Sequence, residues 1–122
     1  MSWKYSQSQG RLWKPDGSVA GIGYAGANEG KNNPAKQDVK NVGPLPRGSY
    51  SVVAIGTTNK GAYSFKLIPD QTACMFGRSG FMIHGDSIKN PGTASEGCIV
   101  IGSQIRKLIL DSQDRKRSEE HT

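Results

Sequence analysis

The chain has 122 residues, enough for one domain with a hydrophobic core but too few for two. Its 16 Lys and Arg residues against 10 Asp and Glu residues give a net charge of +6, which suits an anionic partner and also suits ordinary solubility. No apolar run approaches the length of a bilayer span, and the basic residues lack interleaved aromatics, so we expect neither membrane insertion nor a nucleic-acid partner.

Short apolar and alternating segments, separated by turns, predict a mainly β protein. The 16 glycines and 6 prolines gather in turn-like clusters, and long helical periodicity is missing. Short strands are expected at residues 2–7, 11–14, 18–24, 49–55, 62–68, 79–84 and 97–101. A Gly- and Asn-rich segment, residues 26–34, predicts a surface loop, and residues 35–40 are expected to form one helical turn.

One amphipathic helix is expected after the last predicted strand, with Ser103 as its N-cap. Its apolar face is expected to comprise Ile101, Ile105, Leu108 and Ile109. The sequence beyond Asp111 is polar, which predicts a fraying end. The expected organisation is therefore one catalytic domain at residues 1–111 and a polar C-terminal tail at residues 112–122.

The first residues, MSWKYSQSQG, lack the apolar segment of a signal peptide. We therefore expect a chain made in the cytoplasm. It either functions there or leaves the cell by a route that requires no cleaved signal.

The strongest chemical signal is a histidine and a cysteine at the ends of two apolar runs. His84 follows the run FMI, and Cys98, fourteen residues later, precedes the run IVI. If the runs are neighbouring strands, the imidazole can take the thiol proton and stabilise the thiolate. A position at a strand end before glycine favours an exposed His84 ring. The other histidine, His121, lies in the polar tail, so His84 is the candidate base.

The two cysteines are expected to differ in environment. Cys98 follows Gly97, which permits a tight turn and close approach of a substrate, and backbone N–H groups near both residues are candidates to bind an oxyanion. Cys74 lies in the segment TACMF and is expected to be a small core residue, although a single disulfide between the two cysteines stays open.

Metal binding is the competing interpretation of these side chains. Cys98, His84, Cys74 and Asp86 include suitable ligands, but the close spacing of a zinc site is missing. The segment GANEGK also fails as a phosphate-binding loop, because asparagine follows the lysine where Ser or Thr is required. We expect no metal and no cofactor.

Taken together, the motifs resemble those of the YkuD-type L,D-transpeptidases. The segments HGD and SEGCI are similar to the His-Gly and Ser-x-Gly-Cys signature of that family, and VGPLPRGSY resembles a segment that precedes a strand there. The likeness is closer to the type VI secretion L,D-transpeptidase-like effectors. It extends over nearly the whole chain, through WKYSQSQGRLWKPDG, NEGKNNP, MFGRSGFMIHGDS and NPGTASEGCIVI.

This resemblance implies a single-domain β-sandwich with one or two short helices and a cysteine acyl-enzyme. By position, Cys98 matches the nucleophile and His84 the general base. Gly85 matches the residue whose backbone orients the histidine, and Ser95 and Gly97 match the turn around the nucleophile.

Two positions depart from the family pattern. Glu96 stands in place of a histidine, and an ionised carboxylate cannot donate a hydrogen bond to an oxyanion. Val100 stands in place of an arginine that follows the cysteine. We assign substrate binding to Glu96 and Arg78, with a surface cation as the alternative for Arg78. Asp86 is expected either to orient His84 or to close a turn.

The reaction implied is attack of the Cys98 thiolate on the bond between diaminopimelate and the terminal D-Ala of a peptidoglycan tetrapeptide stem. Water as acceptor gives an L,D-carboxypeptidase, a D-amino acid gives exchange, and a second stem gives a crosslink; the sequence leaves the acceptor open. The resemblance also implies an antibacterial effector that acts in the periplasm of a target cell. An immunity protein and a secretion-system component are the expected partners.

Two other classes of protein compete with this prediction. A non-catalytic wall-binding module of the same fold is one of them. Glu96 and Val100 favour it, because they stand where the related enzymes carry side chains that the reaction uses. A papain-like cysteine peptidase is disfavoured, because there the cysteine precedes the histidine along the chain, and here the order is reversed.

Overall fold

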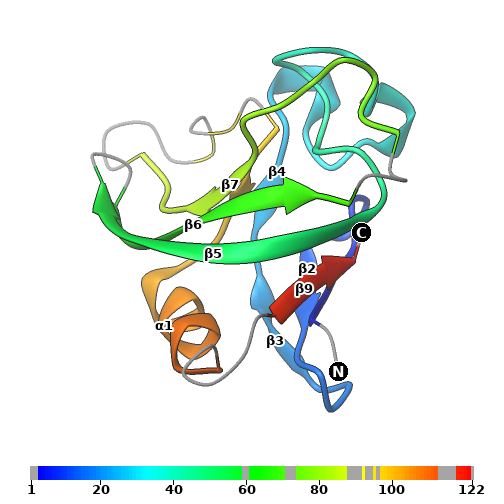
Figure 1. Ribbon diagram of the computed structural model, residues 1–122. Helices are drawn as coiled ribbons and strands as arrows, with labels where there is room; N and C mark the ends of the chain where they lie inside the picture. Colours follow the sequence, from blue (N-terminus) through cyan, green and yellow to red (C-terminus); the bar gives the residue numbers. More distant parts are fainter. Residues whose placement is uncertain are drawn as a thin grey trace.

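The computed structural model describes residues 3–58, 61–70, 74–87, 92, 95, 97–112 and 118–121, and every structural statement below concerns these residues. The fold is mainly β, as the sequence predicts, with a single α-helix in the described part of the chain (Figure 1). No helix in that part is long and apolar enough to cross a membrane.

The strands are β1 (Trp3–Tyr5), β2 (Arg11–Trp13), β3 (Val19–Ile22), β4 (Tyr24–Ala25), β5 (Ser49–Thr58), β6 (Gly61–Pro69), β7 (Met82–His84), β8 (Ile99–Val100) and β9 (Ser118–His121). The helix α1 spans Ser103–Ser112, and two 3-10 turns, η1 (Asn28–Gly30) and η2 (Pro34–Lys36), lie in the predicted loop region. The hydrogen-bonded order of the sheet is β3-β2-β1-β9-β5-β6-β7-β8-β4.

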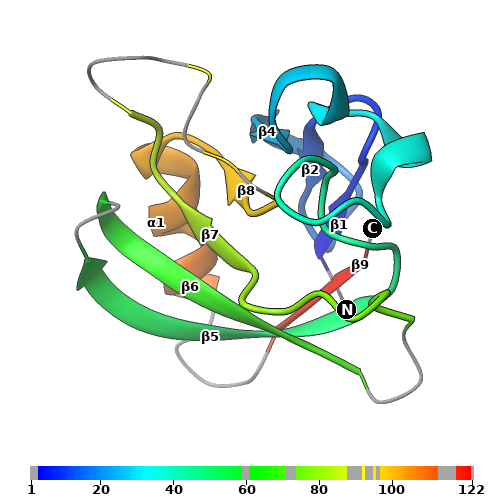
Figure 2. The same cartoon turned by 90° about the horizontal axis from the view of Figure 1, so that it is seen from above.

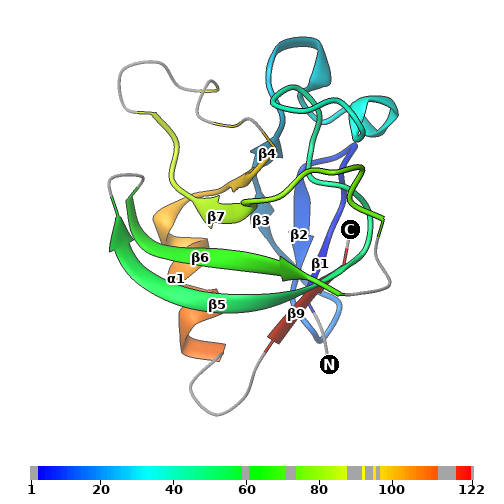
Figure 3. The ribbon, with the colours of Figure 1, turned by 45° about the horizontal axis from the view of Figure 1, so that its top comes forward.

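The sheet is so strongly curled that its two edge strands are consecutive in the sequence. Its edge strands, β3 and β4, follow each other directly and are separated by Gly23 alone. The Gly23 N–H donates to the Gly10 carbonyl at 2.7 Å, and a Cβ at Gly23 would lie 2.0 Å from the Val100 carbonyl oxygen. Only glycine fits this approach. The curl makes the strands β1–β3 cross the long strands β5 and β6 (Figure 3).

The core lies inside this curl and is closed by α1. Its buried side chains include Trp3, Tyr5, Leu12, Tyr50, Val52, Phe65, Leu67, Ile83 and Ile99. From the helix, Ile109 is fully buried, and Ile105 approaches β3 so closely that a Cβ at Gly21 would lie 2.9 Å from its Cγ1. The predicted amphipathic helix is therefore present and covers the sheet.

The chain end differs from the fraying tail predicted for residues 112–122 where the structure describes it, at Ser112 and Ser118–His121. Ser118–His121 form strand β9, which pairs parallel with β1 and antiparallel with β5. A strand with neighbours on both sides satisfies its backbone hydrogen bonds whatever the polarity of its side chains. Polar composition therefore misled the prediction, because backbone pairing between distant segments leaves no trace in the sequence.

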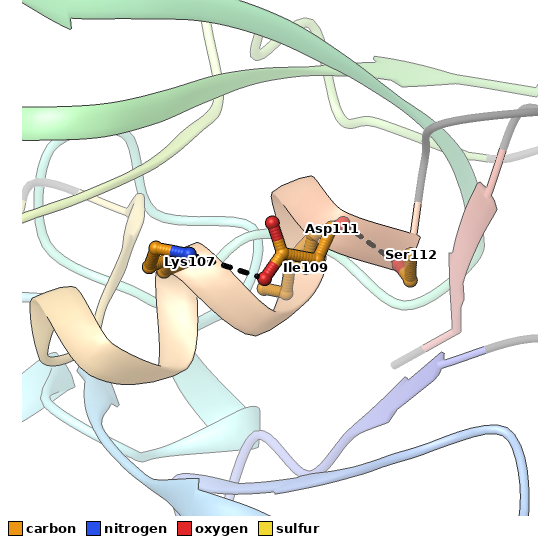
Figure 4. A network of polar contacts seen from close by, with 4 residues as sticks. All are labelled: Lys107, Ile109, Asp111 and Ser112. Atoms are coloured by element: carbon orange, nitrogen blue, oxygen red, sulfur yellow. Dashed lines mark hydrogen bonds and ion pairs between the residues drawn. The ribbon is translucent and has the colours of Figure 1, made fainter.

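The buried face of α1 also differs from the prediction at two positions. Leu108 is 40% exposed, whereas Arg106 is only 5% exposed. Among the described residues, Nε and Nη1 of Arg106 have no hydrogen-bond partner, and burial lowers the pKa of this guanidinium. The exposed side of the helix instead carries the Lys107–Asp111 pair at 3.4 Å (Figure 4).

We expect replacement of Arg106 by methionine to stabilise the fold. Two buried guanidinium nitrogens without acceptors are unfavourable, and an apolar side chain of similar length removes the desolvation penalty, by about 1–4 kcal/mol in comparable cases. Urea unfolding followed by circular dichroism measures the change. Lys107→Met on the exposed side is the matched control and should stay within about 0.5 kcal/mol. A lower free energy of unfolding for Arg106→Met would show that the guanidinium has a stabilising partner.

Candidate cysteine–histidine site

The two apolar runs that carry the histidine and the cysteine are neighbouring strands, as predicted. β7 and β8 pair in parallel, with Ile83 opposite Ile99 and His84 opposite Val100 (Figure 2). Cys98 lies in the turn directly before β8, and His84 ends β7. The topology therefore brings the cysteine and the histidine to two neighbouring strands, with His84 beside the second residue after Cys98.

Cys98 is partly exposed and forms no disulfide among the described residues. Its Sγ donates to the Gly80 carbonyl at 3.9 Å, just before the segment that leads into β7. A partly exposed thiol in a turn is accessible to a substrate, which a nucleophile requires.

The imidazole of His84 is buried, with 1% exposure, which corrects the expected exposed ring. Its Nδ1 lies 2.8 Å from the Gly85 carbonyl. A carbonyl only accepts hydrogen bonds, so this contact assigns the proton of the neutral ring to Nδ1 and leaves the lone pair on Nε2. The predicted orienting role of Gly85 depends on this contact.

The turn before the cysteine is held by one serine. The hydroxyl of Ser95 is buried, accepts from the N–H groups of Gly26 and Gly97 at 2.9 and 3.0 Å, and donates to the Cys98 carbonyl at 2.6 Å. Since the Gly97 N–H donates to Ser95, the expectation that it points at an oxyanion is wrong. Ser95 instead sets the backbone path into Cys98.

Gly97 itself cannot be another residue. Its φ of +142° lies in the region that favours glycine, and a Cβ there would lie 2.6 Å from Nη2 of Arg78 and 3.2 Å from Cε1 of Phe81. Its carbonyl accepts from the Leu45 N–H at 2.9 Å. The turn is thus packed between Arg78 and the segment that precedes β5.

Arg78 is not the surface cation that was the alternative, because it is only 6% exposed. Its Nη1 donates to the carbonyls of Gln37 and Pro44 at 2.6 and 2.8 Å, and its Nη2 donates to the Gly43 carbonyl at 3.0 Å. The guanidinium also lies 5.2 Å from the centre of the Phe81 ring. Arg78 therefore holds residues 37–44 beside the turn, and its contact with a substrate carboxylate stays a prediction.

The charge of Arg78 also acts on the cysteine. Burial lowers the pKa of the guanidinium, while weaker attraction to Tyr50, Asp38 and Cys98 raises that pKa.

We expect Arg78→Lys and Arg78→Ala to destabilise the fold by about 2–4 kcal/mol, since hydrogen bonds from a buried cation are lost. A lysine cannot reproduce the fork that reaches several carbonyls. Alkylation of Cys98 by iodoacetamide should also slow, because the neighbouring cation is displaced or removed. Lys40→Gln, an exposed lysine in the same region, is the control. Unchanged unfolding and alkylation in both Arg78 variants would contradict this role.

The recorded contacts of Asp86 are those of a residue that closes a turn. Its carboxylate accepts from the Tyr24 hydroxyl at 2.6 Å and from the N–H groups of Ser87 and Gly92 at 2.8 and 3.0 Å. Burial raises the pKa of Asp86, but these hydrogen bonds and the nearby Lys31 together lower it below its usual value. The Lys31 ammonium lies 4.6 Å from the centre of the Tyr24 ring. An orienting role toward His84 stays a prediction.

Sequence reasoning missed several residues that build the site. Tyr24, Lys31 and Gln37 lie on segments far from the motif in sequence and join it only through the contacts above. Tyr24 at the end of a predicted strand was the one local signal, since a tyrosine hydroxyl generally seeks a partner.

Two predicted residues have other outcomes. Glu96 lies outside the described residues. Cys74 is free and exposed, which corrects both the core assignment and the open disulfide. Phe76, two residues further on, is 48% exposed, so Cys74 and Phe76 both lie at the surface. Within the described residues, no group of three or more His, Cys, Asp or Glu residues is placed to hold a metal ion.

The comparison with protein families covers most of the chain. Residues 20–121 match the Tlde1 domain, a domain of type VI secretion effectors, and the match includes the strands that carry His84 and Cys98. No curated protein matches the chain. Because the match spans well over half of the sequence, the chain belongs to the Tlde1 domain family of type VI secretion effectors.

Proposed function

We propose that this effector domain is a cysteine-dependent enzyme that modifies the tetrapeptide stems of peptidoglycan. The single observation that carries the proposal is the parallel pairing of β7 with β8, because His84 ends one of these strands and the partly exposed Cys98 directly precedes the other. The buried Arg78 cation, packed against the residue before Cys98, adds support, because a nearby cation generally stabilises a thiolate.

In the proposed reaction, Nε2 of His84 takes the proton of the Cys98 thiol. The thiolate attacks the carbonyl carbon between the L-centre of diaminopimelate and the terminal D-Ala. The C–N bond then breaks, the amine of D-Ala leaves with the proton from His84, and a thioester remains on Cys98. Water, a free D-amino acid or the amine of a second stem completes the cycle by attack on the thioester. The acyl-enzyme thus serves both an L,D-carboxypeptidase and a transpeptidase.

Incubation of the purified chain with disaccharide tetrapeptide tests the activity directly. Mass spectrometry should show loss of D-Ala with water as acceptor, and replacement of D-Ala by D-methionine when that amino acid is added in excess. A substrate of unchanged mass under all conditions, with a folded protein, would overturn the proposed reaction.

The proposed site of action is the periplasm of a target bacterium, because the stems lie outside the inner membrane. We therefore expect toxicity to depend on compartment. Expression with an added secretion signal should lyse or deform the cells, whereas expression without it should be tolerated, as measured by viable counts and microscopy. Equal killing from the cytosol would indicate a cytosolic target. We also propose two partners for the chain inside the cell that produces it, an immunity protein and a component of the secretion system.

A non-catalytic wall-binding module is the second candidate. Val100 favours it, because this buried residue lies opposite His84 where the related enzymes carry an arginine. The Gly97 N–H also favours this function, because it donates to Ser95 and is therefore not available to an oxyanion. Binding of disaccharide tetrapeptide without any change in its mass would select this function.

A further inference from the structure

A cavity of about 410 Å³, with both polar and apolar walls, lies between the N-terminal strands and the segment that precedes β5. Its lining includes Lys4, Ser6, Gln7, Ser8, Trp13 and Arg47. The described residues around it include two cations and no acidic side chain. We call it the Trp13 cavity.

The aromatic and cationic walls of the Trp13 cavity follow from strand register. Lys4 on β1 is the direct cross-strand partner of Trp13 on β2. Their neighbours Tyr5 and Leu12 are buried in the core, so Lys4 and Trp13 lie on the opposite, outer face. The Trp13 ring is partly accessible, and the Arg11 guanidinium lies 6.0 Å from its centre. Two cations therefore lie near the indole, Arg11 on the same strand and Lys4 on β1.

The polar wall is built around Gln7, which is 4% exposed. Its Nε2 donates to the Leu45 carbonyl at 2.9 Å and to Oε1 of Gln37 at 3.3 Å. Both hydrogen bonds recorded for this side chain in the described residues use the nitrogen, which leaves the amide oxygen as an acceptor for a ligand. The hydroxyls of Ser6 and Ser8 lie 3.4 Å apart beside it.

The Trp13 cavity and the cysteine turn are connected through the same backbone segment. Leu45, which accepts from Gln7, donates its N–H to the carbonyl of Gly97, the residue before Cys98. Gln37 bonds to Gln7 and to the Arg47 N–H through its side chain, and its carbonyl accepts from Arg78. The cavity and the turn before Cys98 therefore contact the same backbone segment, residues 37–47, from two sides.

We infer that the Trp13 cavity binds the sugar end of a muropeptide whose stem peptide is processed at Cys98, an inference that rests on the proposed function. A pyranose ring has a C–H face that packs on an indole and hydroxyls that hydrogen-bond to amide and serine oxygens. Carboxylates of the attached peptide match Lys4 and Arg47, and the absence of acidic side chains from the described lining fits an anion. The cavity would select glycan-linked stems over free peptides.

The test measures binding to the full chain carrying Cys98→Ala, so that turnover does not interfere. Isothermal titration with disaccharide tetrapeptide should give a Kd that rises about tenfold or more when Lys4→Gln and Arg47→Gln are added, because charge-assisted hydrogen bonds are lost. Trp13→Ala should weaken binding too, with Trp13→Phe in between if the first variant folds poorly. Lys40→Gln with Lys66→Gln removes the same charge from exposed positions outside the cavity lining and should leave the Kd unchanged.

Several outcomes would overturn the inference. These are no binding of disaccharide tetrapeptide, equal loss of affinity in the control pair, and equal affinity for sugar-free tetrapeptide in every variant. A DNA oligonucleotide that competes with the same dependence on Lys4 and Arg47 would show a general anion site instead. Failure of the proposed function can be told apart from failure of this inference. In the first case the wild type does not turn over disaccharide tetrapeptide, whether or not binding depends on the cavity.

Discussion

Replacement of Cys98 by alanine is expected to abolish release of D-Ala from tetrapeptide stems and the toxicity of the chain in the periplasm. No acyl-enzyme forms without the thiolate, and the methyl group leaves the fold intact because the thiol is partly exposed. Mass spectrometry of the disaccharide tetrapeptide and viable counts measure the two effects. The free energy of unfolding should change by less than about 1 kcal/mol.

The second cysteine supplies the matched control. Cys74 is also free and is exposed, so Cys74→Ala should process stems like the wild type. Cys98→Ser should be nearly inactive as well, since a hydroxyl is far harder to ionise than a thiol. Stem processing by Cys98→Ala at the wild-type rate would refute the cysteine mechanism, and loss of activity in Cys74→Ala would give that residue a role of its own.

Replacement of His84 by alanine is expected to slow acylation by about 10²–10⁴-fold, the usual loss when a general base is removed. The reason lies in the assigned tautomer. Nδ1 contacts the Gly85 carbonyl, so Nε2 carries the lone pair that accepts the thiol proton. Single-turnover kinetics with disaccharide tetrapeptide measure acylation, and the rate of Cys98 alkylation by iodoacetamide reports the thiolate independently of substrate.

Because His84 is buried, the alanine variant also leaves a space in the fold. His84→Gln fills more of that space and retains hydrogen bonding, but it cannot take a proton. Both variants should therefore show slow acylation and slow alkylation, while His84→Gln should unfold closer to the wild type. Alkylation and acylation at wild-type rates in His84→Gln would show that this histidine is a structural residue.

Local patterns in the sequence predicted most of the individual elements. The alternation around Phe65 and Leu67 marks a strand whose inward side chains are buried, and the spacing of Ile105 and Ile109 marks a helix that covers the sheet. Such patterns are local because strand and helix periodicity appear within a few residues. Where a long-range contact decides, they failed. The strand β9 at the polar chain end, which pairs with the distant strands β1 and β5, is one example.

By itself, the sequence determined the mainly β class and the two apolar strands beside His84 and Cys98, although the strand predicted at residues 97–101 spans only Ile99–Val100. These features depend on residues close together in the sequence, so composition and the spacing of apolar residues are enough to predict them. Only the tertiary structure decided that β7 and β8 pair in parallel and that Ser95 holds the turn. Arg78 is the clearest case, since its acceptors are carbonyls of a segment some forty positions earlier. Backbone carbonyls are identical in every residue, so no sequence pattern announces which of them a buried guanidinium will bind.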